Sequence, residues 1–492
     1  MLQQQSLETF LEVLADTNKS NNSGTSGEIV EETEGEEETI IVMGISPNSR
    51  VSLFHFLMES LPPSILLPSQ TELFLRVASA LKSIGVTYVV DTAAAGDIAL
   101  VEAREEFIRR YQANQKAREE LTQSSTNIQE PSRTQVLHRW EKPATSSANS
   151  ATSINLYGPP EEGDPSGAKE TAQPVEVGPV EPGSSPLLPV LSSHCPGFVC
   201  FAEKSQPQCL DYLSTVKSAQ QIMGILMKYA LQQQLQKEKG SNGTTVRRRT
   251  YVVSVQPCFD KKLEASRRDF DHTAGGLLPE GEEVDLVLST TEFWHLLEHI
   301  ASTGCSNIDI GTPSVNSLSA SSTIELDPAT KVLHHLLYAL QPDPMQGRDS
   351  LEGLFRSVSA DGLSFVSAVD ANAGSGGYAE YIFKHAALQL FEVDLFKYTE
   401  GKGEGKGEGS TERLKALPYK LGRGGKNPDM AEVDLQSCLE SIDHGGGTAN
   451  AAGGEGTIVV NGVGTGDRSL RFGRAYGFRN IQSVLNQLKK GE

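Results

Sequence analysis

Short apolar runs alternate with amphipathic stretches in the first part of the sequence, and this alternation constrains the fold more than any other feature. Residues 39–43 and 86–90 are apolar runs of strand length, while 71–84 and 99–111 have the periodicity of helices. Strands that alternate with helices predict a parallel sheet, because parallel neighbours need a long crossover connection. The sequence therefore predicts the α/β class. Further strands are expected at 251–255, 284–288 and 457–461, and further helices at 7–14, 219–236, 292–299, 332–340, 378–390 and 480–488.

Two stretches that are poor in aliphatic residues interrupt this pattern and set the expected domain boundaries. Residues 124–186 are rich in Ser, Thr, Pro, Gly and Glu, and residues 402–455 are rich in Gly. Both compositions are typical of long disordered insertions. The expected organisation is an N-terminal helix and acidic linker at 1–38, the first part of the α/β domain at 39–123, the first insertion at 124–186, the central part of the core at 187–401, the Gly-rich insertion at 402–455, and a last strand and helix at 456–492.

The length and charge of the chain limit the classes of partner. With 492 residues the chain exceeds one ordinary core, so two or three domains are expected. The chain has 43 basic and 63 acidic side chains, and its net charge of −20 disfavours nucleic acid or an anionic membrane as the main partner. No apolar run approaches the ~18 residues of a membrane span, and the first residues do not read as a signal peptide. We therefore expect a soluble intracellular protein.

The six cysteines are scattered rather than arranged as a disulfide framework. No Cys-x-x-Cys pair occurs, so spacing alone indicates no metal site. A lone cysteine is most often a small buried hydrophobic residue, and this is the default expectation for each of them. The six are Cys195, Cys200, Cys209, Cys258, Cys305 and Cys438.

One short pattern suggests zinc chemistry but has a simpler explanation. His295, Glu298 and His299 match the inverted zinc-peptidase motif, in which two histidines one helical turn apart bind zinc and the glutamate acts as a general base. A third ligand is also required, and Glu380 is the candidate on a downstream helix. Because so short a pattern arises by chance in ordinary helices, we expect the histidines to face solvent.

Two segments carry more information, since each places a cysteine soon after an expected strand, at 187–191 for Cys195 and at 251–255 for Cys258. Cys195 is followed by Pro196 and Gly197, and Cys258 follows Pro257. In α/β folds ligands collect at the carboxyl ends of strands, and Pro and Gly fix a backbone that can approach a bound group closely. Lys261, three residues after Cys258, could offset the negative charge of a thiolate-bound cluster. The residues alone support two candidate thiolate ligands, Cys195 and Cys258.

At these segments the sequence resembles the iron-only hydrogenase large-subunit family, and within it the Nar-type cytosolic iron–sulfur assembly factors. Residues 195–204 resemble the first cluster motif of the family, and residues 256–267 resemble the second. Supporting similarities lie at 45–49, 283–285, 290–292, 375–378 and 475–480. The resemblance implies two lobes with mainly parallel sheets and flanking helices, which meet around a buried iron–sulfur site.

The resemblance transfers a limited set of ligands. Cys195 and Cys258 are the implied metal and cofactor ligands, and no catalytic residue is implied. Family members also carry an N-terminal cysteine group and a third motif with a Cys-x-x-x-Cys pair, and this chain is expected to begin just after the former and to stop before the latter. We therefore expect an incomplete [4Fe–4S] site, in which Cys195 and Cys258 lie near one another across the lobe interface, beside an empty, partly open cavity.

The resemblance also implies a role. It indicates an assembly factor that helps transfer [4Fe–4S] clusters to extramitochondrial apoproteins, in the cytoplasm and also in the nucleus. The implied partners are a targeting complex with a WD-repeat protein and the apoprotein clients, without direct binding to nucleic acid or membrane. An iron-only hydrogenase and a nuclear prelamin-binding scaffold of the same family are the alternatives.

We expect this protein to produce no hydrogen. In catalytic relatives a second cysteine precedes the position of Cys195 and relays protons, and here that position is His194. The methionine expected before Pro257 is Gln256. Histidine can carry protons, but the loss of both features together with the downstream ligand pair removes the basis for turnover. Hydrogen evolution from reduced viologen above the level of a Cys258→Ala variant would contradict this expectation.

Overall fold

The computed structural model describes residues 6–23, 37–60, 68–125, 188–242, 247–272, 281–304, 328–343, 377–396, 417–444 and 470–490. The first half contains α1 (Leu7–Ser23), β1 (Glu37–Ile45), α2 (Pro47–Ser60), α3 (Gln70–Ser83), β2 (Tyr88–Asp91), α4 (Ala93–Ser125), α5 (Pro196–Ser205), η2 (Pro207–Tyr212) and α6 (Ala219–Asn242). The second half begins with β3 (Arg247–Gln256), α7 (Asp260–Ala265), η3 (Arg268–Phe270), β4 (Asp271–His272), β5 (Gly281–Glu282), β6 (Leu286–Ser289) and α8 (Thr290–Gly304). It continues with α9 (Pro328–His334), η4 (His335–Ala339), α11 (Tyr378–Phe391), β7 (Lys420–Leu421), α13 (Gly422–Gly425), β8 (Asn427–Asp434), α14 (Leu435–His444), β9 (Arg471–Ala475) and α15 (Phe478–Lys490).

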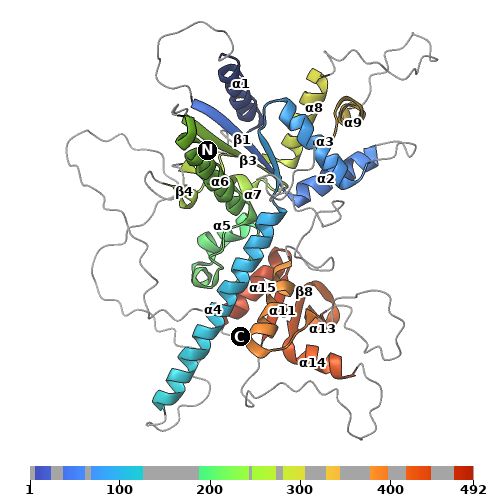
Figure 1. The fold of residues 1–492 in the computed structure, drawn as a ribbon. Helices are drawn as coiled ribbons and strands as arrows, with labels where there is room; N and C mark the ends of the chain where they lie inside the picture. The colour runs from blue at the N-terminus through green and yellow to red at the C-terminus, as the bar shows by residue number, and fades with distance from the viewer. Residues whose placement is uncertain are drawn as a thin grey trace, which may run out of the picture.

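A four-stranded parallel sheet forms the upper part of the molecule, and its strand order is β2–β1–β3–β6 (Figure 1). β1 lies between β2 and β3, so that Val42 is opposite both Tyr88 and Val252. The apolar runs of β1, β3 and β6 are consistent with this place, because a parallel sheet is covered by helices on both faces. The predicted α/β class and parallel sheet are confirmed.

Helices cover both faces of this sheet (Figure 1). Successive strand residues point to opposite faces, so Ile41 and Met43 join a core formed with α1, α2, α3, α8 and α9. Val42 and Val252 point the other way and contact Met223 and its neighbours on α6. The helices that connect the strands thus bury both faces of the sheet.

A second, smaller sheet lies beside the middle of α4 (Figure 1) and consists of β7, β8 and β9. Its core joins α11 and α14 to the sheet and includes Phe383, Val433 and Cys438, with Phe107 of α4 packed against it. The strands of this sheet are antiparallel, whereas the expectation was mainly parallel sheets in both lobes. The core of this lobe therefore forms between an antiparallel sheet and the helices α11 and α14.

Residues 417–444, which lie within the expected Gly-rich insertion at 402–455, have regular secondary structure. These residues form two strands and two helices, and Cys438 lies fully buried in the core of the second lobe. The glycine-rich composition of the flanking residues concealed this ordered segment. The rest of that expected insertion, nearly all of the one at 124–186 and the strand at 457–461 lie outside the described residues, and the other domain boundaries remain predictions.

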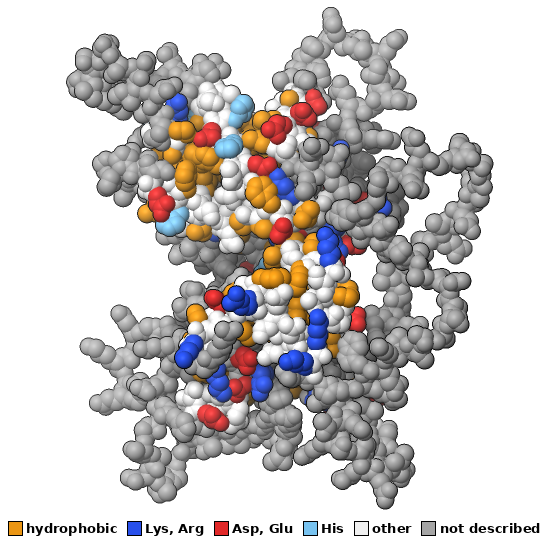
Figure 2. All heavy atoms as spheres, turned by 180° about the vertical axis from the view of Figure 1, so that it is seen from behind, with side chains coloured by type: hydrophobic (Ala, Val, Ile, Leu, Met, Phe, Trp, Pro, Cys, Tyr) orange, Lys and Arg blue, Asp and Glu red, His pale blue; other side chains and the backbone are white. Residues whose placement is uncertain are grey.

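The negative charge of the chain is unevenly distributed over its surface. Residues 470–490, which form β9 and α15, contain five Lys and Arg and no carboxylate, although the chain as a whole has a net charge of −20. Figure 2 shows Lys and Arg side chains over the lower half of one face, while histidines and hydrophobic side chains gather on its upper half. The exposed hydrophobic residues of α2, Val51, Phe56 and Met58, are each about half accessible to solvent.

Two helical glycines lead to opposite stability predictions. A Cβ on Gly224 of α6 would lie 2.2 Å from the backbone oxygen of Glu283, whereas a Cβ on Gly96 of α4 would meet nothing closer than 4.0 Å. We expect Gly224→Ala to lower the free energy of unfolding by about 3 kcal/mol through overpacking. Gly96→Ala should raise it by about 0.5–1 kcal/mol, because alanine favours the helix. Urea unfolding of both variants measures this, and equal effects would contradict the close approach of α6 to the sheet.

Candidate functional site

The carboxyl ends of the four parallel strands form one edge of the sheet, and the chain changes direction there. From β1 the chain connects to β2 on one side, and from β3 it connects to β6 on the other. The strand order therefore reverses between β1 and β3, which is the position where open α/β sheets bind ligands. Two of the expected motifs, 45–49 and 256–267, follow these two strands.

Hydroxyl groups line the loop after β1. The Ser49 hydroxyl lies 2.9 Å from those of Ser46 and Thr290, so hydrogen bonds connect the ends of β1 and β6. Behind them Arg50 Nη1 lies 2.6 Å from Asp91 Oδ2 at the end of β2. Burial raises the pKa of Asp91 although Arg50 opposes this, and burial lowers the pKa of Arg50. This edge of the sheet is polar, buried and internally paired.

The second motif begins at the end of β3 and is held by buried ion pairs. Cys258 is exposed two residues after the strand, and Phe259 beside it is 64% exposed. Lys261 Nζ lies 2.6 Å from Glu264 Oε2, and Lys262 Nζ lies 2.7 Å from Glu292 Oε1. Both lysines are more than nine-tenths buried. The positive charge expected of Lys261 is present and is fixed in place by Glu264.

The first motif packs against the second. Cys195 is exposed and is the N-cap residue of α5, followed by Pro196 at the first helical position. A Cβ on Gly197 would lie 2.5 Å from Asp260 Oδ2 and 3.5 Å from Cys195 Sγ. The start of α5 thus lies directly against the side chain of Asp260 in α7, and this contact brings the two cysteine motifs together.

The strand expected before Cys195 is absent from the described residues around it. Leu191 makes only an isolated parallel bridge to Leu213, and its backbone oxygen accepts a hydrogen bond from Ser214 N at 2.8 Å. Ser214 and Thr215 are in turn anchored to α4 by Glu106. The Glu106 carboxylate accepts hydrogen bonds from Ser214 Oγ at 2.5 Å and from Thr215 N at 3.0 Å. An extended strap fastened to α4, rather than a strand of the sheet, places Cys195.

A cavity of about 210 Å³ opens beside the first motif. Its lining includes the thiols Cys195 and Cys200, the cation Lys217 and the rings of His194 and Tyr378. The two rings meet edge to face at 4.6 Å. Burial, and then the charge of Lys261, lower the pKa of His194 to about 4, so its imidazole is neutral at pH 7. The expected cavity beside Cys195 is present, while Cys258 is not among its lining residues.

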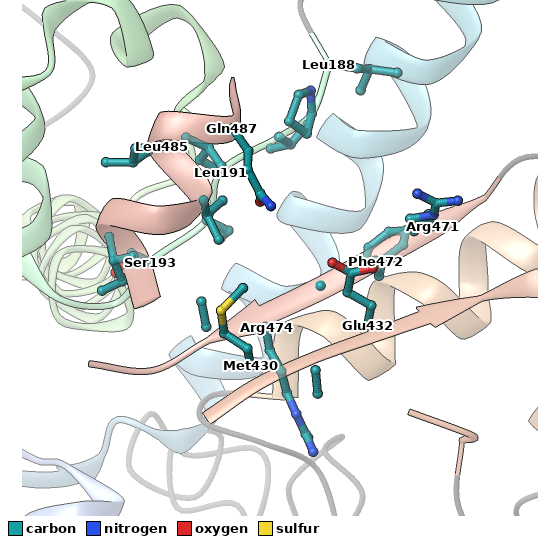
Figure 3. A pocket seen from close by; sticks show the side chains of 18 of the residues that line it. Leu188, Leu191, Ser193, Met430, Glu432, Arg471, Phe472, Arg474, Leu485 and Gln487 are labelled. Carbon is teal, nitrogen blue, oxygen red and sulfur yellow. The ribbon is translucent and has the colours of Figure 1, made fainter. Parts of the chain in front are cut away.

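A larger cavity of about 550 Å³ lies between β9, α15 and the strap before Cys195 (Figure 3). Its walls are mainly apolar and include Leu191, Phe472 and Leu485. Glu432 and Gln487 are among its polar lining residues. None of the motif cysteines lines it. No sequence signal indicated this cavity, because its walls come from segments far apart in the chain.

No metal-binding cluster forms among the described residues: no group of three or more His, Cys, Asp and Glu side chains there is arranged to hold a metal ion. His295 and His299 are exposed on α8, as expected for an ordinary helix, and Glu380 is buried on α11. Cys195 and Cys258 are the exposed motif thiols of the described residues, and thiolates are the usual protein ligands of iron–sulfur clusters.

Comparison with known proteins identifies the class. The family described as "Iron only hydrogenase large subunit, C-terminal domain" matches residues 40–126 and 180–330. These residues contain the parallel sheet and both cysteine motifs. Over these residues the chain is similar to that family, and the predicted resemblance is confirmed.

The individual relatives are assembly factors by name. "Cytosolic iron-sulfur assembly component 3" of Mus musculus is 28% identical over 495 residues, which cover 100% of this chain and 63% of the relative. "Probable cytosolic Fe-S cluster assembly factor narfl" of Dictyostelium discoideum is 27% identical over 470 residues, covering 91% and 58%. The chain therefore spans about three-fifths of the length of these relatives. A solved [FeFe]-hydrogenase structure aligns at 16% identity with a TM-score of 0.49, covering 98% of this chain and 79% of that one.

In the described part of the chain no helix combines the length and the hydropathy that crossing a bilayer requires.

The geometry predicts a clear order of thiol reactivity. Cys195 and Cys258 are exposed, whereas Cys209 and Cys438 are fully buried. Burial raises the pKa of both buried thiols, that of Cys438 to about 12. Since the thiolate is the nucleophile, we expect iodoacetamide at pH 7.5 to alkylate the two exposed cysteines at least about tenfold faster. Mass spectrometry of digested protein measures this, and early labelling of Cys438 would contradict the described core.

Proposed function

We propose that this protein is a cytosolic iron–sulfur assembly factor that helps transfer [4Fe–4S] clusters to extramitochondrial apoproteins. The observation that carries the proposal is the meeting of two cysteine motifs, each with an exposed thiol, at the edge of the sheet where the strand order reverses. The printed names of the relatives, which are assembly factors, support the same role.

In this proposal the cluster is cargo, and Cys195 and Cys258 supply two of its thiolate ligands. A bound cluster has accessible iron sites that exchange thiolate ligands with an acceptor protein. The partial positive charge at the N-terminus of α5 favours an anionic group next to Cys195. The buried pairs of Lys261 and Lys262 hold α7 rigidly, so the motif that carries Cys258 keeps its position as cargo enters and leaves. Because both thiols are exposed, a cluster bound to them would be accessible to an acceptor protein, which suits release of the cluster rather than its permanent retention.

The absence of hydrogenase activity belongs to this proposal. At the position of the proton-relaying cysteine, His194 is neutral at pH 7 and packs against Tyr378. Gln256 donates a hydrogen bond to Ser254 Oγ at 2.9 Å and is committed to the end of β3. Both side chains have structural partners here, which supports an assembly role over the hydrogenase alternative.

The proposed partners are a targeting complex that contains a WD-repeat protein and the apoproteins that receive clusters. The proposed location is the cytoplasm and also the nucleus, in line with the word "cytosolic" in the names of the relatives. The prelamin-binding alternative has no observation in the described residues that favours it.

The decisive experiment replaces the cysteines at the natural gene locus, so that the whole gene product is tested. We expect Cys195→Ser or Cys258→Ser to lower the activity of cytosolic iron–sulfur enzymes severalfold while mitochondrial ones stay normal, since thiolates are the usual cluster ligands. Cys209→Ser is the control, because that thiol is buried outside both motifs. Equal loss of enzyme activity in the cytosol and in mitochondria would place the defect at an earlier step of cluster synthesis. Normal activity of the cytosolic enzymes in both motif variants would refute the proposed assembly function.

A further inference from the structure

An exposed ion pair joins the helices of the two cysteine motifs at the end remote from the thiols. Arg267, which follows α7, donates from Nη2 to Glu203 Oε1 at 2.7 Å and from Nη1 to Glu203 Oε2 at 3.0 Å. Glu203 lies in the last turn of α5. Such a bidentate pair fixes direction as well as distance, because two parallel hydrogen bonds resist rotation.

Arg267 is itself held in place. Its Nε and Nη2 donate to Asp269 Oδ2 at 2.9 and 2.7 Å, so the guanidinium is shared between two carboxylates. The hydrogen bond to Glu203 is the largest cause that raises the pKa of Arg267 above its usual value. The side chains of Arg267 and Glu203 are only 30% and 38% exposed. The pair is therefore a preoriented connection rather than a chance contact of two mobile side chains.

Two of the contacts between α5 and the segment 260–267 thus lie at separate points. Near the thiols, Gly197 approaches Asp260, and at the other end Glu203 binds Arg267. Gly197 and Glu203 are six residues apart, which is about 9 Å along a helix. One contact would allow α5 to pivot, whereas two contacts at this separation fix its angle to α7. Because Cys195 caps α5 and Cys258 precedes α7, the same angle sets the relation between the two thiols.

We propose that Arg267 is a positioning residue for the thiol pair: by bridging to Glu203 it fixes α5 against α7 and keeps Cys195 within reach of Cys258. This inference rests on the proposed function, which makes these two cysteines ligands of one cluster. It assigns no ligand role to Arg267, which acts through the helices. Lysine cannot replace it fully, since a single ammonium cannot bridge Glu203 and Asp269 in the same fork geometry.

The test measures the thiol relation directly and without metal. The protein is treated with short bis-maleimides, and the Cys195–Cys258 cross-linked peptide is quantified by mass spectrometry. Single-site alkylation rates and the melting temperature are measured alongside. The variants are Arg267→Met, Arg267→Lys and Glu203→Gln. Arg104→Lys is the matched control, because Arg104 also makes two short hydrogen bonds to one carboxylate, that of Glu105, away from both motifs.

We expect the cross-link yield to fall about fivefold in Arg267→Met, because each thiol then spends less time near the other and its effective concentration there is lower. The yield should fall less in Arg267→Lys and Glu203→Gln. Single-site alkylation rates and the melting temperature should change little, because exposed ion pairs contribute little to global stability. Wild-type yield in all three variants would overturn the inference, as would an equal loss in the Arg104→Lys control. Failure of the wild-type protein to form the cross-link while both thiols are alkylated would refute the thiol pair itself, and the inference with it.

Discussion

The parallel pairing of β1 with β3 is the interaction on which the rest of the structure depends. It matches Glu37–Ile45 with residues 247–255 over nine consecutive positions, although the two strands are more than 200 residues apart in the chain. The pairing completes the sheet on which both hydrophobic cores form. It also brings the loop after Ile45 beside the loop that contains Cys258, so that assembly of the core and assembly of the site are one event. Such long-range pairing is entropically costly, and burial of apolar side chains on both faces offsets that cost.

The sequence predicted the sheet correctly because its strands are continuous apolar runs. The runs at 39–43, 251–255 and 284–288 lie within or overlap β1, β3 and β6, and Cys258 follows a strand as expected. The position of Cys195 beside the second motif was expected only from the family resemblance. The reasoning from strand ends was wrong for it, because the extended strap before Cys195 resembles a strand in its local pattern but makes only an isolated bridge, to Leu213. Local sequence does not distinguish the two, since the difference lies in the segment with which the strap pairs.

Other features were missed for equally physical reasons. Helix α2 follows β1 after one residue, and its hydrophobic residues Val51, Phe56 and Met58 are exposed, so its pattern gives no clean amphipathic signal. The pair of Glu203 and Arg267 joins residues 64 positions apart, and nothing in either local pattern marks them as partners. The ordered segment 417–444 was obscured by flanking glycines. In each case a tertiary contact decides what the local periodicity leaves open.

Helix α4 has a mechanical consequence for the cavity beside Cys195. It is 33 residues long, or about 50 Å if straight. Its first turns lie against α6 at Gly96, its middle holds Ser214 and Thr215 through Glu106, and Phe107 one residue later enters the core of the second lobe. Because α4 connects these attachments, we expect a tilt of the second lobe to displace Ser214 and Thr215, which line the cavity beside Cys195. The width of this cavity would then depend on a lobe that contributes no thiol to it.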